Sequence, residues 1–303
     1  MAVEEPTAVG RVRRAATRVV QPETERDRVR RRIVALCLPF GVLAAVSGFV
    51  PLWEMAKISV SESQFFTEGF TFEAYRTLLT DPYYWNVAVN TLLFAIATTA
   101  ASLAIAVPAA HALEKYDLPG ERLMVTVISF PISLPGIVAA FMIIVLFGNT
   151  GLLTNFFAWL SGQSAIDLAI ATSVGGLFFA YLYSMIPRSM LLLRGTYAEV
   201  NNDAEEAARS LGATPLQTFY YVTLPQIKPG LIGALILTFR TALAIFGTVL
   251  ILKSLTVWTL QINREIATGF NIRIASAMAA LWFVFVFGFT FLALRFTSAE
   301  VSI

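Results

Sequence analysis

Six long apolar runs constrain this chain more than any other feature of its sequence. A helix needs about 20 mostly apolar residues to cross a hydrocarbon core of roughly 30 Å. The runs that reach this length are Ile33–Trp53, Trp85–Leu113, Leu123–Phe147, Leu168–Pro187, Gly230–Leu252 and Ile274–Leu294, and the stretch Gly148–Ile166 is expected to form an interfacial loop. Only 14% of the residues are charged, whereas soluble domains use about a quarter. The sequence therefore predicts an all-α integral membrane protein with six transmembrane helices.

Basic residues predict how these runs cross the membrane, because cytoplasmic loops carry an excess of Lys and Arg. Residues 1–32 contain nine arginines, and the loops on their side hold more of the remaining basic residues than the opposite loops. With an even number of spans, both termini are expected in the cytoplasm. The first residues form either a short amphipathic helix or a basic tail beside anionic membrane lipid, and both alternatives stay open.

The scarcity of reactive side chains argues against several classes of protein. Cys37 is the one cysteine and His111 the one histidine, so neither a disulfide framework nor a cysteine-based or multi-histidine metal site is expected. The sequence contains no G-x-x-x-x-G-K-[ST] phosphate loop with which to bind ATP. The predicted spans hold no carboxylate, which argues against a secondary transporter, and no catalytic cluster suggests a membrane enzyme. Nothing suggests a nucleic-acid partner.

The longest polar segment between two runs predicts a helix, a turn and a second helix. It reads NNDAEEAARSLGATPLQTFYYVTLPQIKPG and precedes the fifth run on the expected cytoplasmic side. Asn201–Asp203 supplies good N-cap residues, and Glu205-Glu206 suits the first turn of a helix dipole. Gly212 is typical of a helix terminator. Thr214-Pro215 then opens a second helix that runs towards Leu224-Pro225.

This segment resembles the cytoplasmic loop of ABC importer permeases. That family carries the pattern E-A-A, three residues, G, nine residues, I, one residue, L-P. The chain has the same spacing at Glu206-Ala207-Ala208, Gly212, Val222 and Leu224-Pro225, with valine in place of isoleucine. Four more stretches look like segments of the same family: Asn90–Phe94, Pro108–Leu113, Leu118–Gly120 and Pro131–Val138.

The resemblance implies the six-helix fold of a type I ABC importer permease in the bacterial cytoplasmic (inner) membrane. Such a chain is a transport subunit, not an enzyme, and forms the path for a small solute delivered by an extracytoplasmic binding protein. A separate ABC ATPase dimer binds ATP and Mg, and a second permease, expected here to be a paralogue, completes the path. No metal or cofactor is expected on this chain. The residues expected to couple it to the ATPase are Glu205, Glu206, Ala207, Ala208, Gly212, Val222, Leu224 and Pro225.

On this interpretation the chain has four parts. Residues 1–32 form a cytoplasmic basic arm, and residues 33–84 form the first transmembrane helix and an external loop. Residues 85–295 form the permease transmembrane domain, with the coupling loop at 188–228. Residues 296–303 form a cytoplasmic tail. The resemblance covers about residues 85–295, so the arm and first span lie outside it.

Several residues are candidates for the translocation path. Arg240 lies deep inside a run, and an intramembrane charge is a functional hypothesis by default. It is expected to attract an anion, to pair with the second permease, or to serve structure or gating. Pro135 and Gly136, with Ser133 beside them, interrupt the third run as in broken helices that line transport paths, or as a packing kink. Thr91 faces a polar path or bonds between helices.

The cargo is predicted from two stretches only. Ile245–Thr248 and Thr259–Ala280 look most like permeases for polyamines, aminoethylphosphonate or ferric iron. Importers of sugars or of sulfate-like anions share the fold and remain alternatives. A secondary transporter is the alternative from another class.

Overall fold

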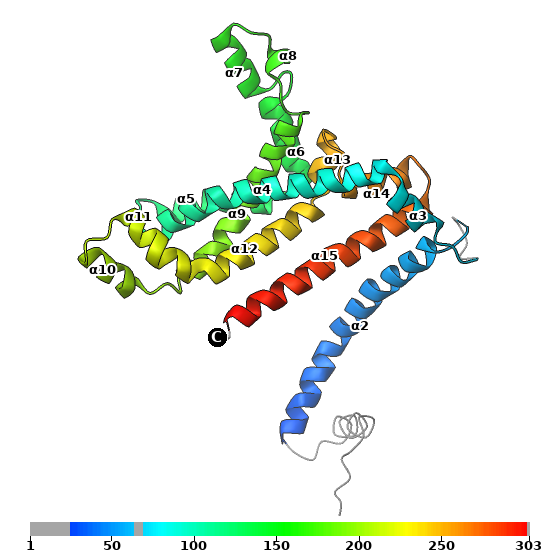
Figure 1. The fold of residues 1–303 in the computed structure, drawn as a ribbon, viewed down its shortest axis with the longest axis horizontal. Helices are drawn as coiled ribbons and strands as arrows, with labels where there is room; N and C mark the ends of the chain where they lie inside the picture. Colours follow the sequence, from blue (N-terminus) through cyan, green and yellow to red (C-terminus); the bar gives the residue numbers. More distant parts are fainter. Residues whose placement is uncertain (1–24, 64–68, 302–303) are drawn as a thin grey trace, which may run out of the picture. The chain divides into compact units, whose positions relative to one another are not determined.

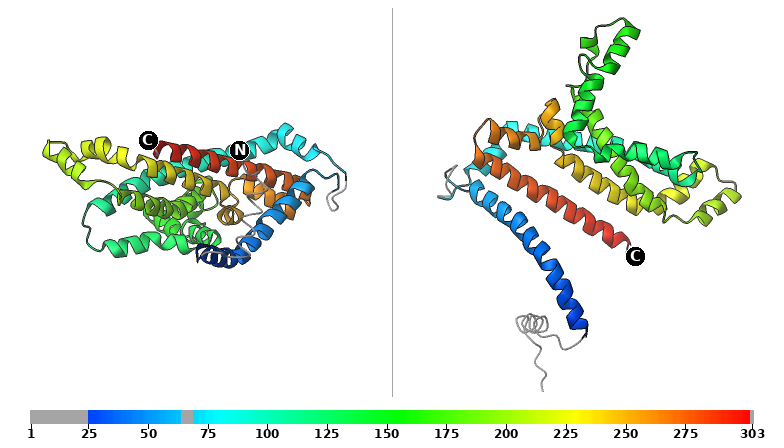
Figure 2. Two further views of the ribbon diagram at one scale, coloured as in Figure 1. Left: turned by 90° about the horizontal axis from the view of Figure 1, so that it is seen from below. Right: turned by 180° about the vertical axis from the view of Figure 1, so that it is seen from behind.

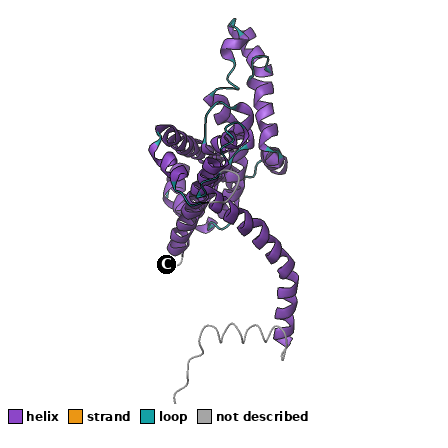
Figure 3. Ribbon diagram, turned by 90° about the vertical axis from the view of Figure 1, so that its right-hand side faces the viewer, coloured by secondary structure: helices purple, strands orange, loops and turns teal. Residues whose placement is uncertain are grey.

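The computed structural model describes residues 25–63 and 69–301, and its secondary structure is helical, with no strand in these residues (Figure 3). Residues 1–24, which hold most of the predicted basic arm, lie outside the described residues. The chain divides into two compact units, Met1–Ile58 and Ser59–Ile303.

Six helical stretches in the described chain are long and apolar enough to cross a membrane. They are Arg28–Ser59, Pro82–Lys115, Gly136–Ser161, Val174–Tyr197, Pro215–Leu252 and Ile272–Arg295. Each overlaps one of the six predicted runs. The prediction of an all-α membrane protein with six transmembrane helices is therefore confirmed.

The described part of the first unit is helix α2 (Glu25–Ser59). Between Ile33 and Trp53 its side chains are uncharged and mostly apolar on every side, and no residue in its most apolar window is buried. A helix that is hydrophobic all round is suited to lipid or to a membrane partner. Pro39 and Pro51 lie inside α2, which membrane helices tolerate.

Three helices form the centre of the second unit: α4 (Pro82–Lys115), α9 (Val174–Tyr197) and α12 (Leu224–Ala244). Figures 1 and 2 show them lying along one another, and α4 and α9 share the longest contact. Ala106 and Ala180 in this contact are fully buried, with 0% of their surface exposed. Small side chains let membrane helices pack closely by van der Waals contact, because lipid supplies little hydrophobic driving force between helices.

Helices α14 (Trp258–Ala267) and α15 (Ile272–Val301) pack on this centre through buried polar bonds. The Trp258 backbone N–H donates to Thr91 Oγ1 at 2.8 Å, which joins α14 to α4. The Trp258 indole donates to the Met278 carbonyl at 3.0 Å, which joins α14 to α15. Thr91 thus bonds between helices, one of its two predicted alternatives.

The third apolar run is interrupted at Pro135-Gly136, as the sequence predicts, and does not form one helix. Helix α5 (Glu121–Ser129) leads into a 3₁₀ turn, η1 (Phe130–Ser133), and α6 (Gly136–Phe147) starts after a break. Pro131 and Pro135 are the reason, because proline lacks the amide hydrogen that a continuing helix needs and its ring crowds the preceding turn.

The fifth run is also broken, and its break meets the first one. After Ile245-Phe246 the chain resumes as α13 (Gly247–Leu252), which packs on α6. Thr248 Oγ1 donates to the Gly136 carbonyl at 3.1 Å. A Cβ at Gly136 would lie 3.0 Å from Thr248 Oγ1, so the close approach of the two breaks favours glycine there.

Two further boundaries differ from the prediction. The expected loop Gly148–Ile166 contains helix α7 (Leu152–Ser161), whose sequence LLTNFFAWLS is itself apolar. The fourth span begins at Val174, later than predicted, because the Ser173 hydroxyl caps it by accepting from the Gly176 N–H at 3.2 Å. Four short helices complete the described chain: α3 (Glu73–Thr80), α8 (Ala165–Leu168), α10 (Asn202–Ser210) and α11 (Pro215–Thr218).

The contact between α9 and α12 predicts a sharp difference between two glycines. A Cβ at Gly230 would lie 2.0 Å from Thr196 Oγ1 and 2.6 Å from Thr196 Cβ, whereas a Cβ at Gly233 would meet nothing within 4 Å. We expect Gly230→Ala to destabilise the fold by about 1–3 kcal/mol through overpacking. Gly233→Ala, the matched control, should leave the melting temperature in detergent unchanged or raise it, and equal melting of both variants would contradict the described α9–α12 contact.

Candidate functional site

The segment from Asn201 to Thr218 folds as the sequence predicts. Asn201 Oδ1 accepts from the Asp203 N–H at 2.9 Å and caps α10. Gly212 ends this helix with a φ of 91°, a left-handed conformation that favours glycine. Thr214 and Gln217 then form a reciprocal capping box at the start of α11, with bonds of 3.3 and 2.8 Å.

The second helix does not stop at the fifth span but merges with it. Helix α11 passes through a π-helical turn, η2 (Phe219–Thr223), directly into α12. The candidate span Pro215–Leu252 has 38 residues, far more than the about 20 that a bilayer requires. Part of this length is α13, beyond the break at Ile245-Phe246, and α11 and η2 continue without interruption into α12.

Two adjacent glutamates of α10 differ in burial. The Glu205 residue is only 4% exposed and forms an ion pair with Lys115, the last residue of α4, with Nζ and Oε2 3.1 Å apart. Its other oxygen, Oε1, accepts from Thr223 Oγ1 at 2.6 Å. Glu206 is exposed. Glu205, expected to take part in coupling, is thus bonded within its own chain, and Glu206 is available to a partner.

An exposed apolar surface surrounds Glu206. The loop residue Leu211 is 89% exposed, and Leu216, Tyr220 and Tyr221 are also exposed. Between α10 and η2 lies a groove of about 380 Å³. Its lining consists of Ala208, Leu211, Gly212, Ala213, Gln217, Thr218, Tyr221 and Val222. We name this groove, together with Glu206 and Ala207, the docking surface.

Sequence reasoning missed part of the docking surface. Ala207 is exposed and Ala208, Gly212 and Val222 line the groove, but Leu211 and Tyr221 were not among the expected residues. The sequence could have indicated both residues, because large apolar side chains in a polar segment outside the spans require a partner. Pro225 is exposed, whereas Leu224 is half-buried and packs inside the chain.

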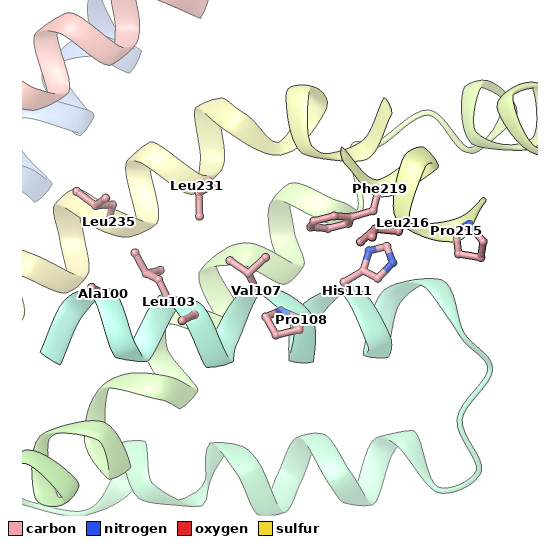
Figure 4. A pocket seen from close by; sticks show the side chains of 11 residues that line it. Ala100, Leu103, Val107, Pro108, His111, Pro215, Leu216, Phe219, Leu231 and Leu235 are labelled. Atoms are coloured by element: carbon pink, nitrogen blue, oxygen red, sulfur yellow. The ribbon is translucent and has the colours of Figure 1, made fainter. Parts of the chain in front are cut away.

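An apolar cavity is lined by the membrane helices α4 and α12 together with α11 and η2. It measures about 770 Å³ and lies between α4 and the α11–α12 stretch (Figure 4). In Figure 4, His111 of α4 faces Phe219 and Leu216 across it, and the ring centroids of His111 and Phe219 are 5.0 Å apart. His111 also packs on Tyr197 at the end of α9, with ring centroids 5.6 Å apart. Three helices therefore meet beside α10.

Arg194 adds a charged link at the same end of the bundle. It lies in the last turn of α9 and forms ion pairs with Glu114 of α4 and with Glu121 of α5, the latter at 2.8 Å. Surface ion pairs contribute little stability, but this arrangement joins three helix ends at one point.

Arg240, the candidate for the translocation path, is exposed and faces a different cavity. This cavity measures about 600 Å³ and lies between α12, α14 and α15, with Thr259, Trp282 and Thr290 among its lining residues. Among the described residues, no ion-pair or hydrogen-bond partner of Arg240 is found. The carboxylates within the described candidate spans, Glu54 and Glu114, lie near helix ends.

The other path candidates are scattered. Ser133 and Pro135 are exposed at the α5–α6 break, and Gly136 packs on Thr248, so these three lie together. Thr91 is buried between α4 and α14. The described residues contain no cluster of three or more His, Cys, Asp or Glu side chains that would hold a metal ion.

Curated relatives in sequence are described as transport system permease proteins. A sulfate transport system permease protein, CysW, from Synechococcus elongatus is 33% identical over 160 residues, which are 52% of this chain and 54% of the relative. CysT from Salmonella typhimurium is 29% identical over 189 residues, 59% of this chain and 66% of the relative. The chain spans about half to two-thirds of the length of these curated relatives.

Solved structures share the fold. A chain of a bacterial ABC transporter involved in the import of the acidic polysaccharide alginate matches with a TM-score of 0.75 at 16% identity, covering 88% of this chain and 95% of the other. An amino acid ABC transporter solved with histidines matches with a TM-score of 0.52 at 18% identity, covering 77% and 100%.

The family model for "binding-protein-dependent transport system inner membrane component" matches residues 102–298, more than half of the chain. This region begins inside α4 and contains the complete α10–α11 segment. The chain therefore belongs to this family and is a multi-pass inner-membrane permease of the ABC importer class.

Proposed function

We propose that this permease carries a small solute across the membrane and takes its energy from a separate ATPase that binds the docking surface. The observation that carries the proposal is the rigid, capped α10–Gly212–α11 segment with an exposed Glu206 and a groove beside it. The ATPase dimer would hold ATP and Mg, and this chain would bind neither. A second permease, expected to be a paralogue, and an extracytoplasmic binding protein complete the proposed assembly, with both termini of this chain in the cytoplasm.

The chemistry of the docking surface suits a protein groove. Ala207 and Ala208 permit close approach of a partner, and Glu206 offers a charge to a basic side chain. A Cβ at Gly212 would meet nothing within 4 Å, so its positive φ, not crowding, requires glycine there. Leu211 projects from this turn, and burial of a leucine side chain in a partner contributes about 1.5–3 kcal/mol.

Leu211 gives the clearest test of docking. We expect Leu211→Ala to weaken binding of the ATPase about tenfold or more, because the lost burial exceeds 1.4 kcal/mol. Binding is measured by titration of the ATPase onto the purified permease in nanodiscs. Leu160→Ala is the matched control, since Leu160 of α7 is also exposed, at 66%, and lies outside the docking surface. Unchanged affinity of the Leu211→Ala variant would contradict the proposal.

We further propose that the cargo is a sulfate-like oxyanion. Two relatives at 33% and 32% identity are described as sulfate permeases, which favours this alternative over polyamines, aminoethylphosphonate or iron. Arg240 supports it, because a cation that has no partner among the described residues and lines a cavity between helices repels polyamine and ferric cations and attracts anions. Sugars remain the second candidate. A secondary transporter is no longer an alternative, given the family.

Arg240 provides the test of this cargo class. In cells without their own sulfate importer, co-expression of the complete importer should restore uptake of labelled sulfate. Arg240→Gln should lower this uptake about tenfold or more through loss of a charge-assisted contact, and Arg240→Lys should keep more of it. Arg122→Gln, which removes an exposed cation of α5 outside the coupling loop, is the control. Equal uptake by Arg240→Gln and the wild type would refute the role of Arg240, and absence of uptake by the wild type would refute sulfate as cargo.

A further inference from the structure

We infer that Lys115 and Glu205 form a positioning joint that makes α10 move as one body with the ends of α4 and α12. This inference rests on the proposed docking of α10 to an ATPase. It assigns to Glu205 a role opposite to that of its neighbour Glu206: Glu206 faces the partner, and Glu205 passes the movement inward.

The joint uses both oxygens of one carboxylate for two different helices. Glu205 Oε2 lies 3.1 Å from Lys115 Nζ at the end of α4. Glu205 Oε1 accepts from Thr223 Oγ1 at 2.6 Å, where η2 passes into α12. Lys115 Nζ also donates to Asn202 Oδ1 at 2.6 Å, so it holds α10 at two points one turn apart. Three elements are thus bonded around a single charge pair.

Because the Lys115–Glu205 ion pair is buried, it fixes the position of α10 relative to the end of α4. The Lys115 and Glu205 side chains are only 7% and 5% exposed. A buried ion pair gives up hydration, so it often stabilises a fold no more than apolar side chains of the same size would. Its particular effect is on register, because a slip of α10 relative to the end of α4 would leave two buried charges without partners. Apolar contacts oppose such a slip much less.

A second polar bond joins α10 to α12, because the backbone N–H of Asn201, the N-cap of α10, donates to Gln226 Oε1 at 3.0 Å. The contacts that hold α4, α9 and α12 to one another at this end are mainly apolar. His111 lies one turn before Lys115 and packs on Phe219 and Tyr197 through ring faces and edges. The buried cluster beneath contains Leu113, Leu193 and Ile227. Rings and aliphatic chains hold helices together but permit sliding and rotation. The Lys115–Glu205 pair, with the bond of Glu205 to Thr223, is therefore the buried polar link that would convert a shift of α10 into movement of both α4 and α12.

The test uses the complete importer in nanodiscs, on a background with Cys37→Ser, and three changes at the joint. Lys115→Met removes the cation at nearly constant length, and Glu205→Gln removes the anion but can still accept from Thr223. The exchange Lys115→Glu with Glu205→Lys restores a pair with reversed polarity. Arg273→Met is the control, because it removes a different ion pair, with Glu73 at 3.0 Å, that joins α15 to α3.

Three measurements are made on each variant. The first is copurification of the ATPase. The second is the distance between spin labels at the exposed positions Asp117 and Arg209, without nucleotide and after trapping with ATP, Mg and vanadate. The third is the stimulation of ATP hydrolysis by the binding protein, which needs no knowledge of the cargo.

We expect every variant to retain the ATPase. In the wild type and the Arg273→Met control, the label distance should be the same in both states. In Lys115→Met and Glu205→Gln the distance should shift or broaden after trapping, and stimulation should fall about tenfold, within the range of allosteric couplings. The exchange should restore both properties.

Other outcomes overturn the inference. Normal distances and stimulation in Lys115→Met would show that the pair transmits nothing. Loss of the ATPase from Lys115→Met would show that the pair merely folds the docking surface, and failure of the exchange to restore either property would exclude an electrostatic link. If the wild type itself binds no ATPase, the docking proposal is refuted, and the inference about the joint is refuted with it.

Discussion

The hydrocarbon core of a bilayer offers no water to a peptide group, and the described fold depends on that constraint. An unpaired amide or carbonyl in lipid costs several kcal/mol, so spanning segments become helices that satisfy their own backbone. Hydrophobic burial then contributes little to holding the helices together, since lipid is as apolar as leucine. The packing of α4 on α9 through fully buried alanines such as Ala106 and Ala180 follows from this, and so does the use of buried hydroxyl groups between helices.

The same constraint explains how two spans can be broken. At the end of α12 the carbonyl of Ile245 is freed from helical bonding, and Thr259 Oγ1 donates to it at 3.1 Å. At the start of α6, Thr248 Oγ1 donates to the carbonyl of Gly136 and so ties α13 to α6. The carbonyl freed at the α12 break is thus satisfied by a side chain from elsewhere in the chain, and the two breaks are held together by a second such bond. Irregular backbone at membrane depth is tolerated where protein covers it, which accounts for the pairing of the two breaks.

The segment that we propose docks to an ATPase has the opposite requirement, because such an element must be both rigid and exposed. Its rigidity comes from the Asn201 cap, the turn at Gly212 and the inward bonds of Glu205. Its exposure is concentrated on Glu206 and Leu211. The two adjacent carboxylates therefore have different roles. Glu205 bonds within the chain and fixes α10, so that Glu206 is held at a defined angle on the surface.

The sequence by itself determined the fold class, the six spans, the caps of α10 and α11 and the family, because apolar length, capping residues and motif spacing are local properties. It could not place the breaks beside each other or separate Glu205 from Glu206, since both depend on which distant residues come near. Lys115 and Thr223 lie far from Glu205 in sequence, and Thr248 lies far from Gly136. Only tertiary packing decided that Thr91 bonds to Trp258 and that Arg240 stands unpaired among the described residues. The energy of a polar group in a low-dielectric interior depends on its hydrogen-bond or ion-pair partner, and the tertiary fold determines which residue that partner is.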